Sequence, residues 1–193
     1  MIVVTVRRIA LFVVLAAATA LAVPSNAGAV DVSVAAQVLA GTRSITTATV
    51  GPLASIGRTA TATSAVAVTV TEALVNGDNS WSVTARLCGA AACGSLTDRI
   101  VLSGDSNTQL AGSAFELSDV TVLDTSGGLG GGTVTPMSDA DLSTTRTLFT
   151  NTGQSAASLY SGVYAAAGTL SVTPPANATP GSYTGYLVVT LVE

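Results

Sequence analysis

The side chains in this sequence that are best suited to acid–base or metal chemistry are a few aspartates. Asp139 and Asp141, in the stretch SDADLS, would share one face of an extended chain, and Asp119 and Asp124 lie near each other in sequence. Two neighbouring carboxyl groups can act as general acid and base, and calcium takes oxygen ligands from loops. No loop has the dense Asp, Asn and Gly spacing of a calcium-binding motif. We therefore predict no catalytic residue, no metal site and no cofactor.

Histidine and lysine are both absent from the sequence, which removes several kinds of site. Without histidine there is no Ser–His–Asp or Cys–His arrangement, and the usual zinc sites lose a main ligand. The glycine-rich stretch SGGLGGG at 126–132 lacks the lysine of a phosphate-binding loop, so we predict a flexible surface connection there. Beyond residue 29, five arginines stand against 11 acidic residues, and so acidic a chain is not expected to bind nucleic acid.

The only two cysteines, Cys88 and Cys93, bracket the short stretch GAAA. Cysteines of a secreted protein usually pair, so we predict a disulfide between them. Residues 89–92 would then form the tip of a hairpin, with the two cysteines facing each other across it. The small ring would contribute roughly 2 kcal/mol and fix the hairpin register. A redox-active pair would normally have Cys-x-x-Cys spacing, which this sequence lacks.

The elements that must position these residues are strands, because apolar residues recur at every second position. In WSVTARL, Trp81, Val83, Ala85 and Leu87 share one face. This phase favours a core position for Trp81 over an exposed platform that stacks on a sugar ring. Turn-forming residues separate the strand-like stretches, so we predict a single antiparallel β-sandwich of the Ig-like or Greek-key type. Further strand-like stretches occur at 30–39, 65–72, 99–103, 114–123, 168–174 and 186–192.

Residues 1–29 have the pattern of a secretory signal peptide. Two arginines precede an apolar run of 15 residues, and Ala27 and Ala29 have the small-x-small spacing that a signal peptidase accepts. The apolar run is shorter than the roughly 20 residues of a membrane span. We therefore predict export, removal of this segment and a mature β-sandwich domain at 30–193. Within that domain, the Thr- and Ala-rich range 42–63 is the least certain to be ordered.

The last predicted strand, YLVVTLV, carries apolar residues on both of its faces. Tyr183, Leu187, Val189 and Leu191 share one face, with Gly185 between them leaving room for the close approach of another segment. The opposite face is also largely apolar. Because both faces would need cover, we predict a central or well-covered strand that completes the sandwich.

The stretches NSWSVTARL and PANATPGSYTGYLVVTLVE resemble the WxL-domain surface proteins of Gram-positive bacteria and their divergent actinobacterial relatives. That family carries an upstream Trp-x-Leu and a C-terminal Tyr-Thr that is followed by a second Trp-x-Leu. Here Trp81 and Val83 form a Trp-x-Val, and Tyr183 precedes a Val-x-Leu made by Val189 and Leu191. Val189 thus stands where the family has its second tryptophan. The resemblance implies packing or wall-binding roles for these five residues.

The resemblance further implies an exported, non-catalytic β-sandwich at the cell surface, attached non-covalently to the peptidoglycan of the cell wall. The C-terminal residues contain no apolar anchor and no sorting motif, which agrees with non-covalent attachment. The expected partners are peptidoglycan or other surface proteins, with no membrane contact once the signal peptide is removed. Two alternatives remain open. One is a fimbrial, coat or surface-layer subunit that assembles through strand edges. The other is a secreted carbohydrate-binding domain that uses Trp81, or Tyr160 and Tyr164, together with carboxylates.

Overall fold

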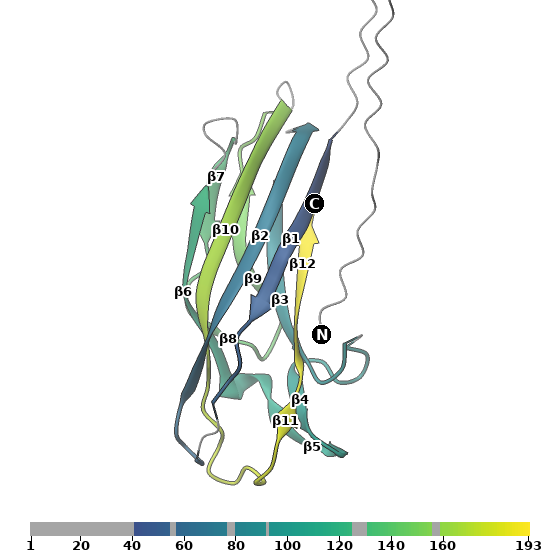
Figure 1. Cartoon of the computed structure of the whole chain (residues 1–193), viewed down its shortest axis with the longest axis vertical. Coiled ribbons are helices and arrows are strands. Elements are labelled where there is room, and N and C mark those ends of the chain that lie inside the picture. The colour runs from purple at the N-terminus through teal and green to yellow at the C-terminus, as the bar shows by residue number, and fades with distance from the viewer. Residues whose placement is uncertain (1–40, 55–56, 77–79, 92, 125–130, 156–158) are drawn as a thin grey trace, which may run out of the picture. The chain divides into compact units, whose positions relative to one another are not determined.

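The computed structural model describes residues 41–193 except 55–56, 77–79, 92, 125–130 and 156–158. The predicted signal peptide at 1–29 and the strand predicted at 30–39 lie outside the described residues. The described residues belong to one unit built almost entirely of antiparallel strands (Figure 1). None of them lies in a helix with the length and hydropathy of a membrane span.

The largest sheet has five strands, of which β2 and β10 are the longest. Valine, alanine and threonine alternate in β2, and β-branched side chains favour strands because they pack well on a pleated surface. In β2 Val66, Val68 and Val70 are buried, whereas Ala65 before them and Ala67 between them are exposed. In spatial order the strands are β1 (Thr42–Val50), β2 (Ala62–Asn76), β10 (Leu159–Val172), β6 (Phe115–Asp124) and β8 (Ala140–Asp141).

Two further sheets contain the remaining strands. The four-stranded sheet has the order β12 (Tyr186–Val192), β3 (Trp81–Cys88), β9 (Arg146–Thr152) and β7 (Thr133–Pro136). The three-stranded sheet has the order β11 (Tyr183–Thr184), β4 (Arg99–Leu102) and β5 (Asp105–Ala111), and a short 3-10 turn, η1 (Gly112–Ala114), follows β5. The last segment of the chain runs through both sheets, because β11 is followed directly by β12.

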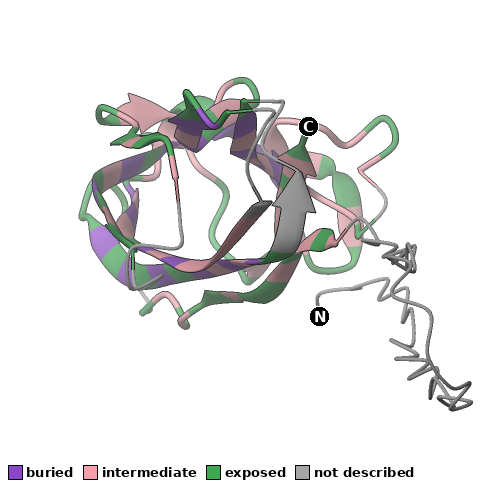
Figure 2. Ribbon diagram, turned by 90° about the horizontal axis from the view of Figure 1, so that it is seen from above, coloured by how far each residue is buried: buried purple, intermediate pink, exposed green. Residues whose placement is uncertain are grey.

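The core lies between the five-stranded and the four-stranded sheet (Figure 2). Trp81 is 2% exposed, and its ring meets the rings of Phe149 and Tyr164 edge-on at centroid distances of 5.6 and 5.2 Å. Strand β1 lies beside β12 at one side of the sandwich, and β6 lies beside β7 at the other. The prediction of an all-β antiparallel sandwich with Trp81 in its core is confirmed.

The predicted last strand is divided at Gly185 into two strands with different partners. Strand β11 pairs with β4, whereas β12 pairs along its length with β3. A Cβ at Gly185 would lie 2.2 Å from Ile100 Cγ2, so the close approach at this point requires glycine. Strand β12 lies at the edge of its sheet, so of the two predicted positions, central or well-covered, the central one is wrong. Only the face with Leu187, Val189 and Leu191 packs against the core, while β1 lies beside the edge of β12 without pairing.

Two other predictions concern segments that were expected to be flexible or poorly ordered. Residues 42–50, in the range predicted to be the least ordered, form β1 and pair with β2 in an antiparallel ladder. The glycine-rich connection predicted at 126–132 lies outside the described residues except for Gly131 and Gly132, which lead into β7.

Candidate functional site

The residues that carry the family resemblance lie on two neighbouring strands and one separate strand. Trp81 and Val83 are buried on β3, and Val189 and Leu191 are half-buried on β12. The two strands pair in register, with Leu191 directly opposite Val83. These four side chains therefore contribute to the core of the sandwich. Tyr183 lies apart from them on β11.

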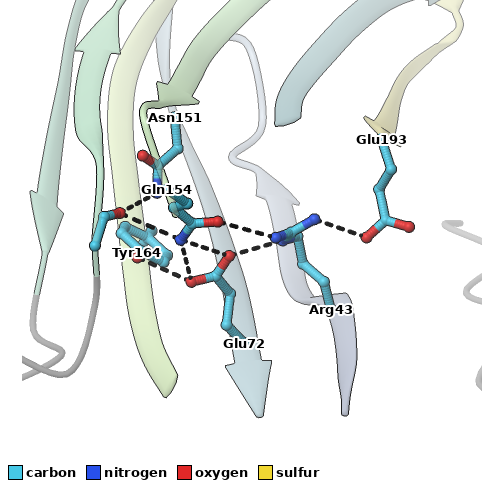
Figure 3. Close-up of polar contacts among 7 residues, drawn as sticks. Arg43, Glu72, Asn151, Gln154, Tyr164 and Glu193 are labelled. Atoms are coloured by element: carbon cyan, nitrogen blue, oxygen red, sulfur yellow. Dashed lines mark hydrogen bonds and ion pairs between the residues drawn. The ribbon is translucent and has the colours of Figure 1, made fainter. Parts of the chain in front are cut away.

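A cluster of polar side chains lies inside the sandwich, near the point where β1 begins and β2 ends (Figure 3). We call Arg43, Glu72, Asn151, Gln154 and Tyr164 the Glu72 network. The Glu72 side chain is 0% exposed. It accepts hydrogen bonds from Arg43 Nε at 2.8 Å, Gln154 Nε2 at 3.0 Å and the Tyr164 hydroxyl at 3.0 Å. Glu72 points inward because it continues the phase of the buried valines of β2.

Arg43, on β1, balances the charge of Glu72 and is almost as deeply buried. Its side chain is 3% exposed, and its guanidinium carbon lies 5.1 Å from the centre of the Trp81 ring, a cation–π distance. Its Nη2 donates to Gln154 Oε1 at 3.3 Å, and its Nη1 donates to Glu193 Oε1 at 2.9 Å. A buried ion pair offsets the cost of losing water only when its other hydrogen-bonding positions are filled, as they are here.

Within the network, the groups that could exchange protons are enclosed and committed to one another. Tyr164 is 0% exposed. Burial, together with the hydrogen bond to Glu72, raises the pKa of the Tyr164 hydroxyl well above its usual value. The hydroxyl therefore remains protonated at neutral pH and keeps donating to Glu72. This arrangement stabilises the fold and offers no acid or base to a ligand in solvent.

Two buried atoms, Trp81 Nε1 beside the network and Asn151 Oδ1 within it, have no hydrogen-bond partner among the described residues. The two residues are cross-strand neighbours on β3 and β9. Asn151 Nδ2 donates to the carbonyl oxygen of Gly131 at 3.0 Å. Gly132, with a φ of 89°, leaves room for this amide, because a Cβ there would lie 2.2 Å from Asn151 Oδ1. This part of the core therefore depends on close packing as well as on hydrogen bonds.

Cys88 and Cys93 form the predicted disulfide, with their Cα atoms 4.9 Å apart. The hairpin predicted around them is wrong. The backbone of Cys88, at the end of β3, pairs with Thr97 in an isolated antiparallel β-bridge. Cys93 lies in a turn with a φ of 54°. The turn is held by a hydrogen bond from Leu96 N to the Cys93 carbonyl and by one from Gly89 N to the Leu96 carbonyl. The disulfide thus ties an irregular loop to the end of β3 and sets no strand register.

The aspartates considered for acid–base or calcium chemistry support local structure. Asp139 accepts a hydrogen bond from the backbone N–H of Asp119 at 3.0 Å. Asp141 accepts hydrogen bonds from Ser143 and, at 3.2 Å, from Arg146 Nη2. These contacts, with Ser143 first, lower the pKa of the Asp141 carboxyl. In the part of the chain that the structure describes, no three His, Cys, Asp or Glu residues gather closely enough to hold a metal ion.

A cleft of about 370 Å³ lies at the other end of the sandwich, between β5 and the segment 173–179. In Figure 1 this is the end with β4, β5 and β11, away from the start of β1. Hydroxyl, amide and small apolar side chains line the cleft together with the ring of Tyr183, and its lining contains no Asp, Glu or Arg. We call it the Tyr183 cleft. Of the five residues that carry the family resemblance, Tyr183 is the one that lines it.

The tyrosines and the tryptophan considered as platforms for a sugar ring have other places in the structure. Trp81 and Tyr164 are 2% and 0% exposed, so neither is accessible as a platform for a sugar ring. Tyr160 is half-buried. The Tyr160 hydroxyl accepts a hydrogen bond from the backbone N–H of Ser155 at 2.7 Å.

Sequence reasoning identified neither the network nor the cleft. A signal for the network was present, because Glu72 ends the stretch AVAVTVTE in phase with three valines that face the core. A charged residue at an inward position requires a buried partner, although the pattern does not say which one. The cleft combines side chains of β5 with side chains more than 60 residues further along the chain, such as Asn177, and nothing in the sequence links them.

Comparison with known proteins identified no relative of this chain. No family model matches the chain, and neither a curated protein nor a solved structure matches it. The resemblance to WxL-domain proteins therefore stays a prediction that rests on the stretches quoted above.

Proposed function

We propose that this protein is an exported, non-catalytic β-sandwich of the cell surface that attaches non-covalently to peptidoglycan. The observation that carries the proposal is the pairing of the two motifs behind the family resemblance. Trp81-Ser82-Val83 and Val189-Thr190-Leu191 are more than 100 residues apart in sequence. They nevertheless lie on neighbouring strands, with Leu191 opposite Val83. Two short matches that belong to one ladder support a shared fold better than two unrelated matches would.

The disulfide supports the exported location. Disulfides form and persist in oxidising compartments and are rare in the cytoplasm, where thiols are kept reduced. Cys88 and Cys93 are bonded to each other, and the loop between β3 and β4 is arranged around this bond. This observation agrees with the signal peptide predicted at 1–29.

The use of charged side chains supports a structural or binding role rather than catalysis. Ion pairs tie neighbouring segments of the sandwich together: Arg43–Glu72, Arg86–Asp98 and Arg146–Asp141. Groups that are held in such pairs are poorly placed to move protons to and from a substrate.

A sedimentation assay with purified, insoluble peptidoglycan tests the proposal. We expect the purified protein to appear in the pellet and to be released by denaturant, since the attachment is non-covalent. Cellulose serves as the control for unspecific retention on an insoluble glycan. Protein that remains in the supernatant with peptidoglycan, or that sediments equally with cellulose, would contradict the proposal.

Assembly through strand edges is a second candidate, and the position of β5 favours it. Strand β5 pairs with β4 on one side, and no other described strand pairs with it. A free edge presents backbone N–H and C=O groups to which a strand of another copy could add. Gel filtration distinguishes the two candidates, because ladders of multimers would support edge assembly and a single monomeric peak would count against it.

A further inference from the structure

We propose that the Tyr183 cleft binds an uncharged saccharide unit through amide and hydroxyl groups and through contact with the Tyr183 ring. The inference rests on the proposed function, because it names the part of the protein that would meet the sugar chain of peptidoglycan. The surface concerned is formed by β5, η1 and the segment 173–183.

The lining of the cleft matches a neutral ligand that is rich in hydroxyl groups. Gln109, Ser113, Asn177 and Thr179 supply amide and hydroxyl groups, and Tyr183 supplies an aromatic ring. With no Asp, Glu or Arg in the lining, a phosphate or carboxylate would lose water without gaining a cation. A neutral sugar instead offers several hydroxyl groups around a ring with apolar C–H faces, and small-ligand sites typically combine apolar contact with a few polar groups.

The wall of the cleft on β5 is ordered by its own hydrogen bonds. Gln109 Oε1 accepts from Arg99 Nη1 at 2.8 Å, and Gln109 Nε2 donates to the Ser106 carbonyl at 2.9 Å. The Thr108 hydroxyl donates to Asp105 Oδ2 at 2.6 Å. The amide of Gln109 still has a second proton and a second lone pair for a ligand. Because these side chains are already held, little rotational freedom is lost on binding.

The opposite wall is also fixed, by a turn and by the hydroxyl of Tyr183. Ala178 N donates to the Pro175 carbonyl at 2.9 Å, which closes a turn with the exposed Asn177 inside it. The Tyr183 hydroxyl donates to the Thr179 carbonyl at 2.8 Å. This bond positions the ring and leaves the hydroxyl oxygen free to accept a hydrogen bond. Both walls are therefore formed before a ligand arrives.

The size of the cleft suits a small ligand such as a saccharide unit. A volume of about 370 Å³ is near the lower limit of the roughly 300–1,000 Å³ that small-molecule sites occupy.

The test is a titration of the folded protein with the trimer of N-acetylglucosamine, an uncharged oligosaccharide, followed by NMR chemical shifts. We expect binding that weakens about tenfold in Asn177→Ala and in Tyr183→Ala, as loss of one good contact predicts. Asn107→Ala is the matched control, because Asn107 is also exposed and lies on β5 but does not line the cleft. Circular dichroism verifies that each variant folds, and Tyr183→Leu, which removes the ring but keeps an apolar side chain, replaces Tyr183→Ala if that variant does not.

The outcomes separate this inference from the proposed function. The saccharide site would be overturned if the native protein, Asn177→Ala and the Tyr183 variant bound the trimer with equal affinity. It would also be overturned if no binding occurred at about millimolar trimer. A third contrary outcome is chemical-shift change at the cleft on adding a strand-forming peptide but none on adding the trimer. Retention on peptidoglycan that is unchanged in both variants would overturn the site and leave the attachment standing. Trimer binding at the cleft without retention on peptidoglycan would support the site and overturn the attachment.

Discussion

The Glu72 network and the Tyr183 cleft lie at opposite ends of the same sandwich and differ in how their polar side chains are satisfied. The network is charged and enclosed, with the side chains of Arg43 and Glu72 only 3% and 0% exposed. The lining of the cleft is uncharged, and Asn177 at its rim is exposed. The network satisfies its groups with partners from the protein, whereas the cleft leaves hydrogen-bonding capacity to solvent.

This difference indicates what each end contributes. Between the two sheets water cannot reach a charged group, so removing one partner leaves a costly unpaired charge in the core. At the cleft, water replaces any contact that is lost, so the free energy of unfolding depends little on a single side chain. We therefore expect substitutions at the network to affect stability, and substitutions at the cleft to affect binding.

Glu72→Ala should have the largest effect on stability. It leaves Arg43 buried without its main partner, so we expect the free energy of unfolding to fall by about 3–5 kcal/mol. Urea denaturation followed by circular dichroism measures the change. The double substitution Arg43→Met with Glu72→Leu is the control, because it removes both charges and keeps the volume, and it should recover most of the loss. If Glu72→Ala were as stable as the native protein, the proposed difference between the network and the cleft would be wrong.

Loss of the disulfide should have the second-largest effect on the free energy of unfolding, and it concerns a loop away from the Glu72 network. Replacing Cys88 and Cys93 by alanine opens a small ring, and the chain-entropy argument predicts a loss of about 2 kcal/mol. The measurement is urea denaturation with and without dithiothreitol. Reductant should lower the midpoint of the native protein and leave that of the double variant unchanged. A native midpoint that does not respond to reductant would contradict the prediction.

The raised pKa of the Tyr164 hydroxyl predicts a smaller effect on stability, and this effect depends on pH. The pKa of this group is raised in the folded state above its ordinary value of 10.0. As pH rises past that value, the unfolded chain releases the proton while the folded chain retains it, so stability falls. We expect the urea midpoint to begin to decline near the ordinary value of 10.0 and to keep declining as pH rises further, and to decline less in Tyr164→Phe. Parallel curves for the two proteins would show that Tyr164 does not carry the effect.

Arg86→Ala should have the smallest effect. Arg86 pairs with Asp98 at 3.1 Å, but the two side chains are 38% and 25% exposed. An accessible pair of this kind contributes less than about 1 kcal/mol and is weakened by salt. The same urea experiment, at low and high salt, compares it directly with Glu72→Ala. A loss as large as that of the buried pair would show that exposure does not distinguish the two pairs.

Alternation in the sequence was sufficient to predict β3, β6 and β12 and the burial of Trp81, because period two is a direct consequence of strand geometry. It did not predict β1, which lies in the range predicted to be the least ordered. It was not sufficient to predict the position of β12. Both faces of this strand are apolar, which we interpreted as a central or well-covered position. The strand instead lies at the edge of its sheet, and β1 of the other sheet lies beside it without pairing in a ladder. Sequence patterns record which side chains are covered and not which element covers them.

Features that depend on loop conformation were harder to predict. The spacing of Cys88 and Cys93 indicated the disulfide correctly, but the left-handed backbone at Cys93 has no signal in the run of alanines before it. The Tyr183 cleft likewise depends on how the segment 173–179 turns toward β5. Such features are decided by tertiary contacts rather than by local periodicity.

The contact between Arg43 and Glu193 joins residues that are 150 positions apart in the chain. The first and last strands that the structure describes, β1 and β12, therefore approach each other at one place, while β5 lies toward the far end of the molecule (Figure 1). Such a layout lends itself to circular permutation, since a short linker could bridge the two strands. It also means that a tag or fused reporter attached at Glu193 would project from the side opposite the cleft, so immobilised protein would keep that cleft accessible.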